Sequence, residues 1–242
     1  MELCASIQVQ YWQTVLCSKS RPNVKPQNVT CYTKTDIMPI EHRYINQLNA
    51  IEDNQSFCDR PIARKSNILI IGTFNPSDTS CEKENIATWF YGRNKSKFWR
   101  YFPTALTGTS LHPNDGSNGH PQSWKDYCCV NNVVVIDLIK SININDMLPS
   151  FGDKAVECKI NNDLTNTEYI DIGRAFSRIT FNKVIYSLTW TDKCIPRLKR
   201  IRDIVNRRLI ENNCIQNANQ IKYCLTPSRN DAGPSWNNAV NG

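Results

Sequence analysis

The chain has 242 residues, of which 40% are hydrophobic and 21% are charged, and this balance excludes an intrinsically disordered protein. No apolar run approaches the roughly 18 residues of a membrane span, and the first residues lack the basic-then-apolar order of a secretory signal. We therefore expect a cytoplasmic protein without a membrane partner. The net charge of +7 is compatible with a polyanionic partner, although many enzymes that never touch nucleic acid have such a charge.

The cysteines indicate neither a zinc site nor a secreted disulfide scaffold. There are 11 of them, an odd number, and no two are spaced as C-x-x-C. Zinc sites usually show such paired spacings, and disulfide scaffolds are smaller with even numbers. We predict that most of the cysteines are reduced and that the protein holds no metal. Cys58 and Cys81 flank the first predicted strand, so they are the pair best placed to converge from a distance.

The first part of the chain lacks a regular strand and helix rhythm. We predict that residues 1–60 form an N-terminal extension packed on a main domain over residues 61–242. Within the extension, residues 40–51 are predicted to be helical, because Ile40, Tyr44, Leu48 and Ile51 fall on one helix face.

From residue 66 onward, short apolar runs alternate with helical segments. Strands are predicted at 68–71, 130–136, 183–187 and 221–225, and helices at 169–179 and 195–211. This alternation is typical of a parallel sheet with right-handed crossovers. The predicted fold is therefore α/β, a three-layer α/β/α sandwich around a central, mainly parallel four-stranded sheet. Ligands of such sheets bind beyond the carboxyl ends of the strands.

The first predicted strand runs into the sequence Gly72-Thr73-Phe74-Asn75-Pro76-Ser77. A glycine here permits a sharp turn and a close approach of a ligand to the backbone. Pro76 stiffens the loop, so Asn75 is presented in a fixed orientation and can hold a water or recognise a base edge. Asp78 is a candidate for orienting that water or for capping a helix. A purely structural turn stays open as the alternative.

Residues 89–100 combine aromatic and basic side chains. Five aromatic residues and four cations fall within these 12 positions. Aromatic rings stack on unpaired bases and cations contact phosphates. The alternative is a helix that packs in the core, which we predict for Trp99. Tyr91 and Asn94 flank a glycine and are predicted to face a site.

The last predicted strand leads into residues 226–233, a polar turn that contains Pro227. Ser228 and nearby backbone amides are candidates for gripping a phosphate, and Arg229 for filling the space of an extruded base. A plain turn is the alternative. His112 and His120, in a predicted loop over 108–121, are not expected to be catalytic, since neutral loop histidines are common.

Taken together, these segments resemble the uracil-DNA glycosylase superfamily. Gly72 to Pro76 is similar to its first motif, in the branch with Asn before the proline. Phe90 to Asn94 with Phe98 to Arg100 is similar to the segment that supports the base pocket. Val133 to Asp137 is similar to the middle strand-plus-acid block, and Leu225 to Ala232 to the second motif. The resemblance covers residues 66–236.

Two departures from the family pattern leave the excised base open. Two residues, Thr73 and Phe74, separate Gly72 from Asn75, where the mismatch-specific branch usually has one. Thr226 stands where some branches place a histidine before Pro-Ser.

The resemblance implies a monomeric, monofunctional DNA glycosylase of base-excision repair that needs no cofactor. Such an enzyme flips a uracil or modified pyrimidine out of DNA and hydrolyses its N-glycosidic bond, leaving an abasic site. The implied residues are catalytic Asn75 and Asp78, base-pocket Gly72, Thr73, Phe74, Tyr91 and Asn94, and DNA-binding Arg93, Lys95, Ser228, Arg229 and Asn230.

Three other functions stay open. One is a phage-defence glycosylase that removes a hypermodified cytosine from invading DNA. Another is a non-catalytic nucleic-acid-binding module on the same fold. A third is an unrelated α/β enzyme that acts on a small nucleotide or nucleoside. Release of a free base from DNA separates the glycosylases from the other two.

Overall fold

The structure, a computed structural model, describes residues 39–58, 61–77, 87–93, 95–115, 120–145, 148–150, 152–187 and 195–242. Most of the predicted N-terminal extension, residues 1–38, lies outside this range. So do Asp78, Cys81, Asn94 and part of the predicted loop over 108–121. Residues 36–242 form one compact unit.

A four-stranded parallel sheet is the centre of the described fold, as the apolar runs predicted. Its order is β3 (Val133–Asp137), β2 (Lys65–Gly72), β6 (Thr180–Tyr186) and β7 (Ile221–Tyr223). All three neighbouring pairs are parallel. The segment 68–71 is at most 2% exposed, as expected for a strand covered on both faces.

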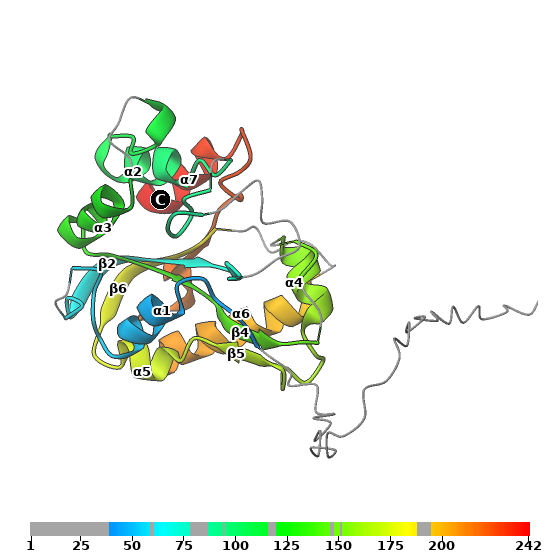
Figure 1. Cartoon of the computed structure of the whole chain (residues 1–242). Helices are drawn as coiled ribbons and strands as arrows, with labels where there is room; N and C mark the ends of the chain where they lie inside the picture. Colours follow the sequence, from blue (N-terminus) through cyan, green and yellow to red (C-terminus); the bar gives the residue numbers. More distant parts are fainter. Residues whose placement is uncertain are drawn as a thin grey trace, which may run out of the picture. The chain divides into compact units, whose positions relative to one another are not determined.

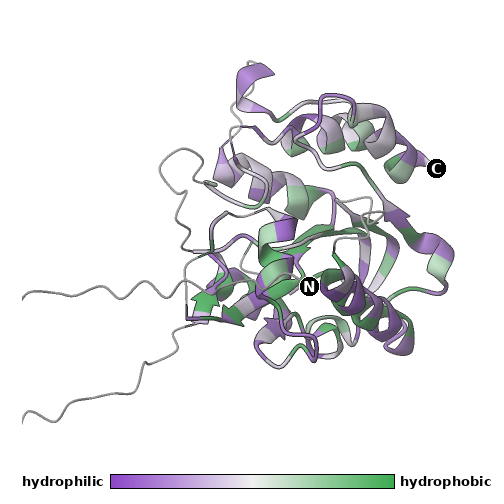
Figure 2. Ribbon diagram, turned by 90° about the vertical axis from the view of Figure 1, so that its right-hand side faces the viewer, coloured by the Kyte–Doolittle hydropathy of each residue, from purple (hydrophilic) through white to green (hydrophobic). Residues whose placement is uncertain are grey.

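Helices cover both faces of this sheet, which confirms the predicted three layers. Figure 1 shows α2 (Phe98–Thr107), α3 (Pro121–Val130) and α7 (Gly233–Asn241) on one side. On the other side lie α1 (Ile45–Glu52), α5 (Ile172–Phe176) and α6 (Pro196–Glu211). Hydrophobic residues gather on the central strands, and hydrophilic residues line the helices around them (Figure 2). No helix in the described ranges is long and apolar enough to cross a membrane.

The helix α6 follows its sequence pattern closely. It begins at Pro196, whose missing N–H costs nothing in the first turn. Its buried residues Leu198, Ile201, Val205 and Leu209 lie one helical turn apart and form an apolar stripe, as expected for a helix packed on a sheet.

A second, antiparallel sheet was not anticipated from the sequence. It contains β1 (Pro39–Glu41), β4 (Ile139–Asn143) and β5 (Thr167–Tyr169), in the order β1-β4-β5. A single residue, Leu138, separates β3 from β4, so the chain passes directly from one sheet into the other.

This small sheet corrects two helix predictions. The helix expected over 40–51 begins at Ile45, because Ile40 pairs with Ile142 in the sheet. The helix expected over 169–179 is reduced to α5, because Tyr169 pairs with Ile139. In both places strand pairing with distant residues outweighs the local helical pattern.

The remaining elements are short. The helix α4 (Asp153–Lys159) precedes β5, and two 3-10 turns, η2 (Pro113–Asp115) and η3 (Ala218–Gln220), interrupt loops. Within α4, Glu157 accepts hydrogen bonds from the backbone N–H groups of Arg197 and Leu198, at 2.9 and 2.8 Å. This carboxylate satisfies two donors at the start of α6.

Among the six described cysteines, two form a disulfide and four have free thiols. Cys58 and Cys129 form a disulfide, with their Cα atoms 6.4 Å apart, a normal separation for such a bond. These two residues are therefore not reduced, and Cys58 pairs with a residue 71 positions away. The thiols of Cys128, Cys158, Cys214 and Cys224 are free.

Candidate active site at the strand ends

The register of the parallel sheet brings four distant segments to one edge. Gly72, the last residue of β2, pairs with Asp137, the last residue of β3. Ser187 follows β6 and donates its backbone N–H to the carbonyl of Ile71 at 3.1 Å. The chain after β7 reaches the same edge at Thr226. Parallel strands all end at this edge, so residues that follow different strands meet here.

A cavity of about 520 Å³ opens at this edge, a volume in the usual range for small-ligand sites. It gathers most of the site residues that the sequence indicated. These are Gly72, Thr73, Phe74, Asn75, Tyr91, Arg93, Lys95 and Ser228.

Asn75 is held firmly at the cavity wall. It is 6% exposed, and its side-chain Oδ1 accepts a hydrogen bond from Arg93 Nη2 at 2.6 Å. Its backbone carbonyl accepts the N–H of Arg43 at 2.7 Å. No described residue accepts from the Asn75 Nδ2 group, which leaves this donor for a ligand or water.

Gly72 is required by its surroundings. A Cβ at this position would lie 2.0 Å from Asp137 Oδ1 and 2.7 Å from the Tyr91 hydroxyl. Both distances are far below van der Waals contact, so no larger residue fits unless these side chains move. The glycine thus allows a carboxylate and a phenol to lie against the backbone at the end of β2.

Tyr91 supplies an aromatic wall from an unusual backbone conformation. Its φ is 57°, in the left-handed region that few side chains other than glycine adopt. The ring stacks on Phe98 at 4.2 Å, and the hydroxyl donates to Ser187 Oγ at 2.7 Å. Burial, with Asp137 nearby, raises the pKa of the Tyr91 hydroxyl, so it stays a neutral donor and acceptor at pH 7.

Asp137 lies between the cavity and a buried histidine. Its Oδ2 atom is 2.8 Å from Nε2 of His42, a residue that is 1% exposed. Nδ1 of His42 accepts the backbone N–H of Tyr44 at 3.0 Å and therefore carries no proton. The imidazole is thus the neutral tautomer that donates from Nε2 to the carboxylate.

Asp153, the first residue of α4, is a second carboxylate in the same cavity. Burial raises the pKa of its carboxyl group, and the nearby charge of Asp137 raises it further. A hydrogen bond from the Thr73 hydroxyl and the charge of Arg93 oppose this rise. A carboxylate with a raised pKa is a better proton acceptor than an ordinary surface aspartate.

The loop after β7 rests on the aromatic segment. The backbone N–H of Lys97 donates to the carbonyl of Pro227 at 2.9 Å, and the Tyr101 hydroxyl donates to the carbonyl of Asn230 at 3.0 Å. Lys97 Nζ donates to Asn230 Oδ1 at 2.5 Å. Arg229 is exposed and pairs with Asp231 at 2.7 Å. Arg229 and Asn230 thus lie beside the cavity loop and do not line the cavity.

Trp99 and His112 lie away from the main cavity. Trp99 is 1% exposed and stacks on Trp124 at 5.0 Å, which confirms its predicted place in the core. His112 lines a neighbouring cavity of about 340 Å³, which shares Tyr91, Arg93 and Ser96 with the main one. Burial lowers the pKa of His112, so it is neutral at pH 7. His120 caps the start of α3 by accepting the N–H of Ser123.

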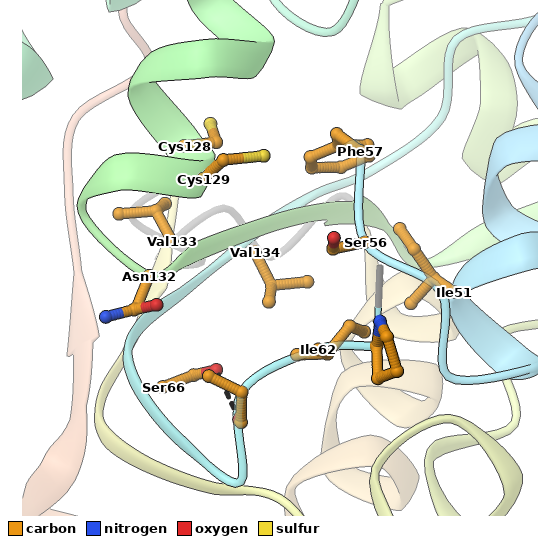
Figure 3. A pocket seen from close by; sticks show the side chains of 12 residues that line it. Ile51, Ser56, Phe57, Ile62, Ser66, Cys128, Cys129, Asn132, Val133 and Val134 are labelled. Carbon is orange, nitrogen blue, oxygen red and sulfur yellow. Dashed lines mark hydrogen bonds between the residues drawn. The ribbon is translucent and has the colours of Figure 1, made fainter. Parts of the chain in front are cut away.

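A further cavity of about 230 Å³ lies at the opposite, amino-terminal ends of β2 and β3. Figure 3 shows Phe57, Ile62 and Val134 pointing toward it, with Cys128 and Cys129 contributed by α3. Its lining contains no acidic, basic or histidine side chain among the described residues.

Sequence reasoning missed three residues of the site and underrated a fourth. Asp137 was recognised as part of a family block but given no role, although an acid directly after a buried strand is a readable signal. Ser187 follows β6 in the same way. His42 and Asp153 have no such signal, because their positions depend on the small sheet and on where α4 begins.

Among the described residues, no cluster of three or more His, Cys, Asp or Glu side chains is arranged to bind a metal. No family model, no curated protein and no solved structure matches the chain.

Proposed function

We propose that this protein is a monofunctional DNA glycosylase. In this proposal it accepts a base flipped out of DNA and hydrolyses the bond between that base and its deoxyribose, leaving an abasic site. An enzyme that acts on a base must first remove it from the stack, and the cavity at the strand ends is of a size to receive it.

One observation carries the proposal. The four segments that resemble the uracil-DNA glycosylase superfamily lie far apart in the sequence, yet each contributes to one cavity. Asn75 comes from the first, Tyr91 from the second, Asp137 from the third and Ser228 from the fourth. The parallel sheet alone brings the strand ends together. The support for the proposal is that these four segments supply an amide, an aromatic ring, a carboxylate and a hydroxyl to one cavity that could receive a base.

The geometry suits hydrolysis by water. In our scheme Asn75 holds a water, whose oxygen bonds to C1′ of the sugar as the N-glycosidic bond breaks. The bonding electron pair leaves with the base, which then takes a proton from solvent. The proton of the water passes to the Asp153 carboxylate, whose raised pKa favours that transfer. A negative carboxylate also stabilises the oxocarbenium-like sugar of the transition state.

The test replaces the residue that holds the water. Asn75→Ala is expected to slow single-turnover base excision by roughly 10²-fold, the usual loss when one transition-state stabiliser is removed. Its affinity for the same duplex should change little. Base release is measured by mass spectrometry, and abasic sites by strand cleavage in alkali. Asn238→Ala, on an exposed face of α7, serves as the matched control.

The outcomes separate the competing functions. Excision by Asn75→Ala within threefold of the wild-type rate would remove Asn75 from the mechanism. Tight DNA binding without release of any base by the wild-type protein would favour a non-catalytic binding module. Cleavage of free nucleosides without action on DNA would indicate a small-molecule enzyme.

A further inference from the structure

The cavity contains an acceptor that lacks a donor. Asp137 uses Oδ2 to bind His42, but its Oδ1 has no hydrogen-bond donor among the described residues. The side chain is 9% exposed, and Oδ1 lies against the backbone of Gly72 in the cavity wall. Oδ1 is not one of the fully buried side-chain atoms that lack a hydrogen-bond partner among the described residues, so it is open to the cavity. A ligand or water there can therefore satisfy this acceptor.

His42 fixes what this oxygen can do. Its ring is held between the backbone N–H of Tyr44 and the carboxylate of Asp137, and it stacks on Phe90 at 5.5 Å. Because Nε2 donates to Oδ2, the carboxylate is held in one orientation with Oδ1 toward the cavity. An ionised carboxylate accepts hydrogen bonds and donates none. His42 is thus a positioning residue, and Asp137 is a rigid acceptor.

Asn75 provides the complementary group. Its Oδ1 is engaged by Arg93 at 2.6 Å, so the carboxamide faces a ligand with its Nδ2 donor. The wall therefore offers an acceptor at Asp137 and a donor at Asn75. The matching ligand presents an N–H group and, beside it, an acceptor.

We propose that Asp137 selects a base with an exocyclic amino group, of the cytosine or adenine type, over a base with a carbonyl at the same position. The amino group donates to Asp137 Oδ1, and the adjacent ring nitrogen accepts one N–H of Asn75 Nδ2, whose second N–H holds the water of the proposed mechanism. A carbonyl oxygen in the place of the amino group would put its partial negative charge beside the negative charge of the carboxylate, and the two would repel. The imide N–H of uracil lies between two such carbonyls, which repel an approaching carboxylate. This inference rests on the proposed function and names its substrate class.

The first experiment measures binding without chemistry. The probes are two matched pairs, 1-methylcytosine with 1-methyluracil and 9-methyladenine with 9-methylhypoxanthine, titrated into the full chain and followed by NMR. The amino member of at least one pair should bind about tenfold more tightly, the worth of one hydrogen bond. Equal binding within both pairs, a preference for the carbonyl member in both, or no binding of any probe overturns the proposal.

Variants identify the residue responsible. Asp137→Asn introduces a donor of the same shape, so its preference should move toward the carbonyl member. Asp163→Asn, in an exposed loop, should keep the wild-type preference. His42→Gln keeps a side-chain donor and should retain most of the selectivity, whereas His42→Phe should lose it. Circular dichroism checks that each variant is folded. An unchanged preference in folded Asp137→Asn overturns the assignment.

The second experiment separates this inference from the proposed function. Matched duplexes carry cytosine or uracil, 5-hydroxymethylcytosine or 5-hydroxymethyluracil, or adenine or hypoxanthine, at one position opposite an abasic-site analogue, so that none of these bases is paired. Faster release of an amino-bearing base supports both proposals. Release of the carbonyl-bearing bases alone leaves the glycosylase standing and overturns the selectivity. Amino-selective binding with no base released from any duplex supports the selectivity and rejects the glycosylase.

Discussion

At the scale of single residues, the site is defined by how closely its groups approach one another. Gly72 lacks a side chain, and the space that a side chain would fill is occupied by Asp137 and Tyr91. The backbone of Tyr91 adopts a left-handed conformation, and its ring lines the cavity. Such unusual conformations are concentrated at functional sites, where the surrounding structure holds them. Both features show that the groups at this edge of the sheet are held in a close and specific arrangement.

The close approach at Gly72 gives a direct prediction. In Gly72→Ala the new methyl group would meet Asp137 Oδ1 at 2.0 Å, so the carboxylate must move out of its place. We expect base excision to fall by roughly 10²-fold, as when a positioned catalytic group is lost. Single-turnover kinetics measure it. Gly152→Ala is the control, because that residue lines the same cavity and its Cβ meets only Ser150 Oγ, at 3.5 Å. Similar rates in the two variants would argue against the steric explanation.

Asp153 gives a prediction about pH. Its raised pKa means that it binds a proton more tightly in the folded protein than in the unfolded chain. The free energy of unfolding therefore falls as pH rises from the ordinary aspartate pKa through the raised one. Asp153→Asn removes this fall, so the variant should have a higher Tm than the wild type at pH 7.

The comparison at low pH completes that test. Near pH 3 the wild-type carboxyl is protonated in both states, so the gap in Tm between wild type and Asp153→Asn should close. Excision should nevertheless be slower in the variant, since its amide cannot accept the proton of the water. A variant that is less stable than the wild type at pH 7 would show that the charge of Asp153 is not costly in the fold.

At the scale of elements, the small antiparallel sheet holds the loop over residues 72–77 in place through backbone hydrogen bonds. The backbone N–H of His42 donates to the carbonyl of Lys140 at 2.7 Å, which joins the chain after β1 to β4. The N–H of Ser77 donates to the carbonyl of Glu41 at 2.8 Å. The loop that carries Asn75 is thus tied to β1, and β1 in turn places His42 behind Asp137.

A buried ion pair fastens α1 to the same sheet. Lys140 Nζ lies 2.9 Å from Glu52 Oε2 and 2.9 Å from Glu168 Oε1. Burial by itself lowers the pKa of Lys140, but the hydrogen bonds that its ammonium donates to these two carboxylates outweigh that effect and raise the pKa. Lys140 therefore stays charged at pH 7, and its partners satisfy it.

The disulfide gives the prediction at this scale, because it joins the turn after α1 to the end of α3. Cys58 and Cys129 enclose a separation of 71 residues. In the chain-entropy account, closing a loop of this length stabilises the fold by roughly 4 kcal/mol. Reduction, or the double substitution Cys58→Ser with Cys129→Ser, should lower the free energy of unfolding by an amount of this order, measured with urea.

Unlike the stability, the excision rate should not depend on the disulfide. The disulfide lies near the amino-terminal ends of β2 and β3, whereas the proposed active site lies at their carboxyl ends. At temperatures well below the unfolding transition, reductant should therefore leave the excision rate unchanged. Cys158→Ser, at an exposed free cysteine, controls for general effects of losing a thiol. Unchanged stability after complete reduction would contradict the prediction.

At the scale of the whole molecule, the parallel sheet brings residues that are far apart in the sequence close together in space. Positions as far apart as 72 and 228 contribute to one cavity because the four strands run in the same direction. The residue after each strand therefore has a predictable location even when its contacts are unknown. This explains why Asn75 and Ser228, which follow β2 and β7, could be nominated together from sequence.

The sequence by itself determined the central architecture of this protein. Uninterrupted apolar runs such as Ile68 to Ile71 specify strands buried on both faces, and the stripe of α6 specifies a helix packed on one side. These patterns involve neighbouring residues and recur along the chain, so the secondary structure that they predict is seldom changed by distant contacts. Gly72 and Asn75 were readable for the same reason, since they directly follow such a run.

Only the tertiary structure decided the small sheet and the chemistry around Asp137. Strands of three residues, such as β1 and β5, are too short to show a period, and they form because distant backbone groups pair with them. His42 reaches Asp137 across 95 positions, and the pKa of Asp153 depends on its burial beside Asp137. Whether a carboxylate is a surface charge or an acceptor in a binding site is set by its neighbours and its solvation, which are properties of the folded chain.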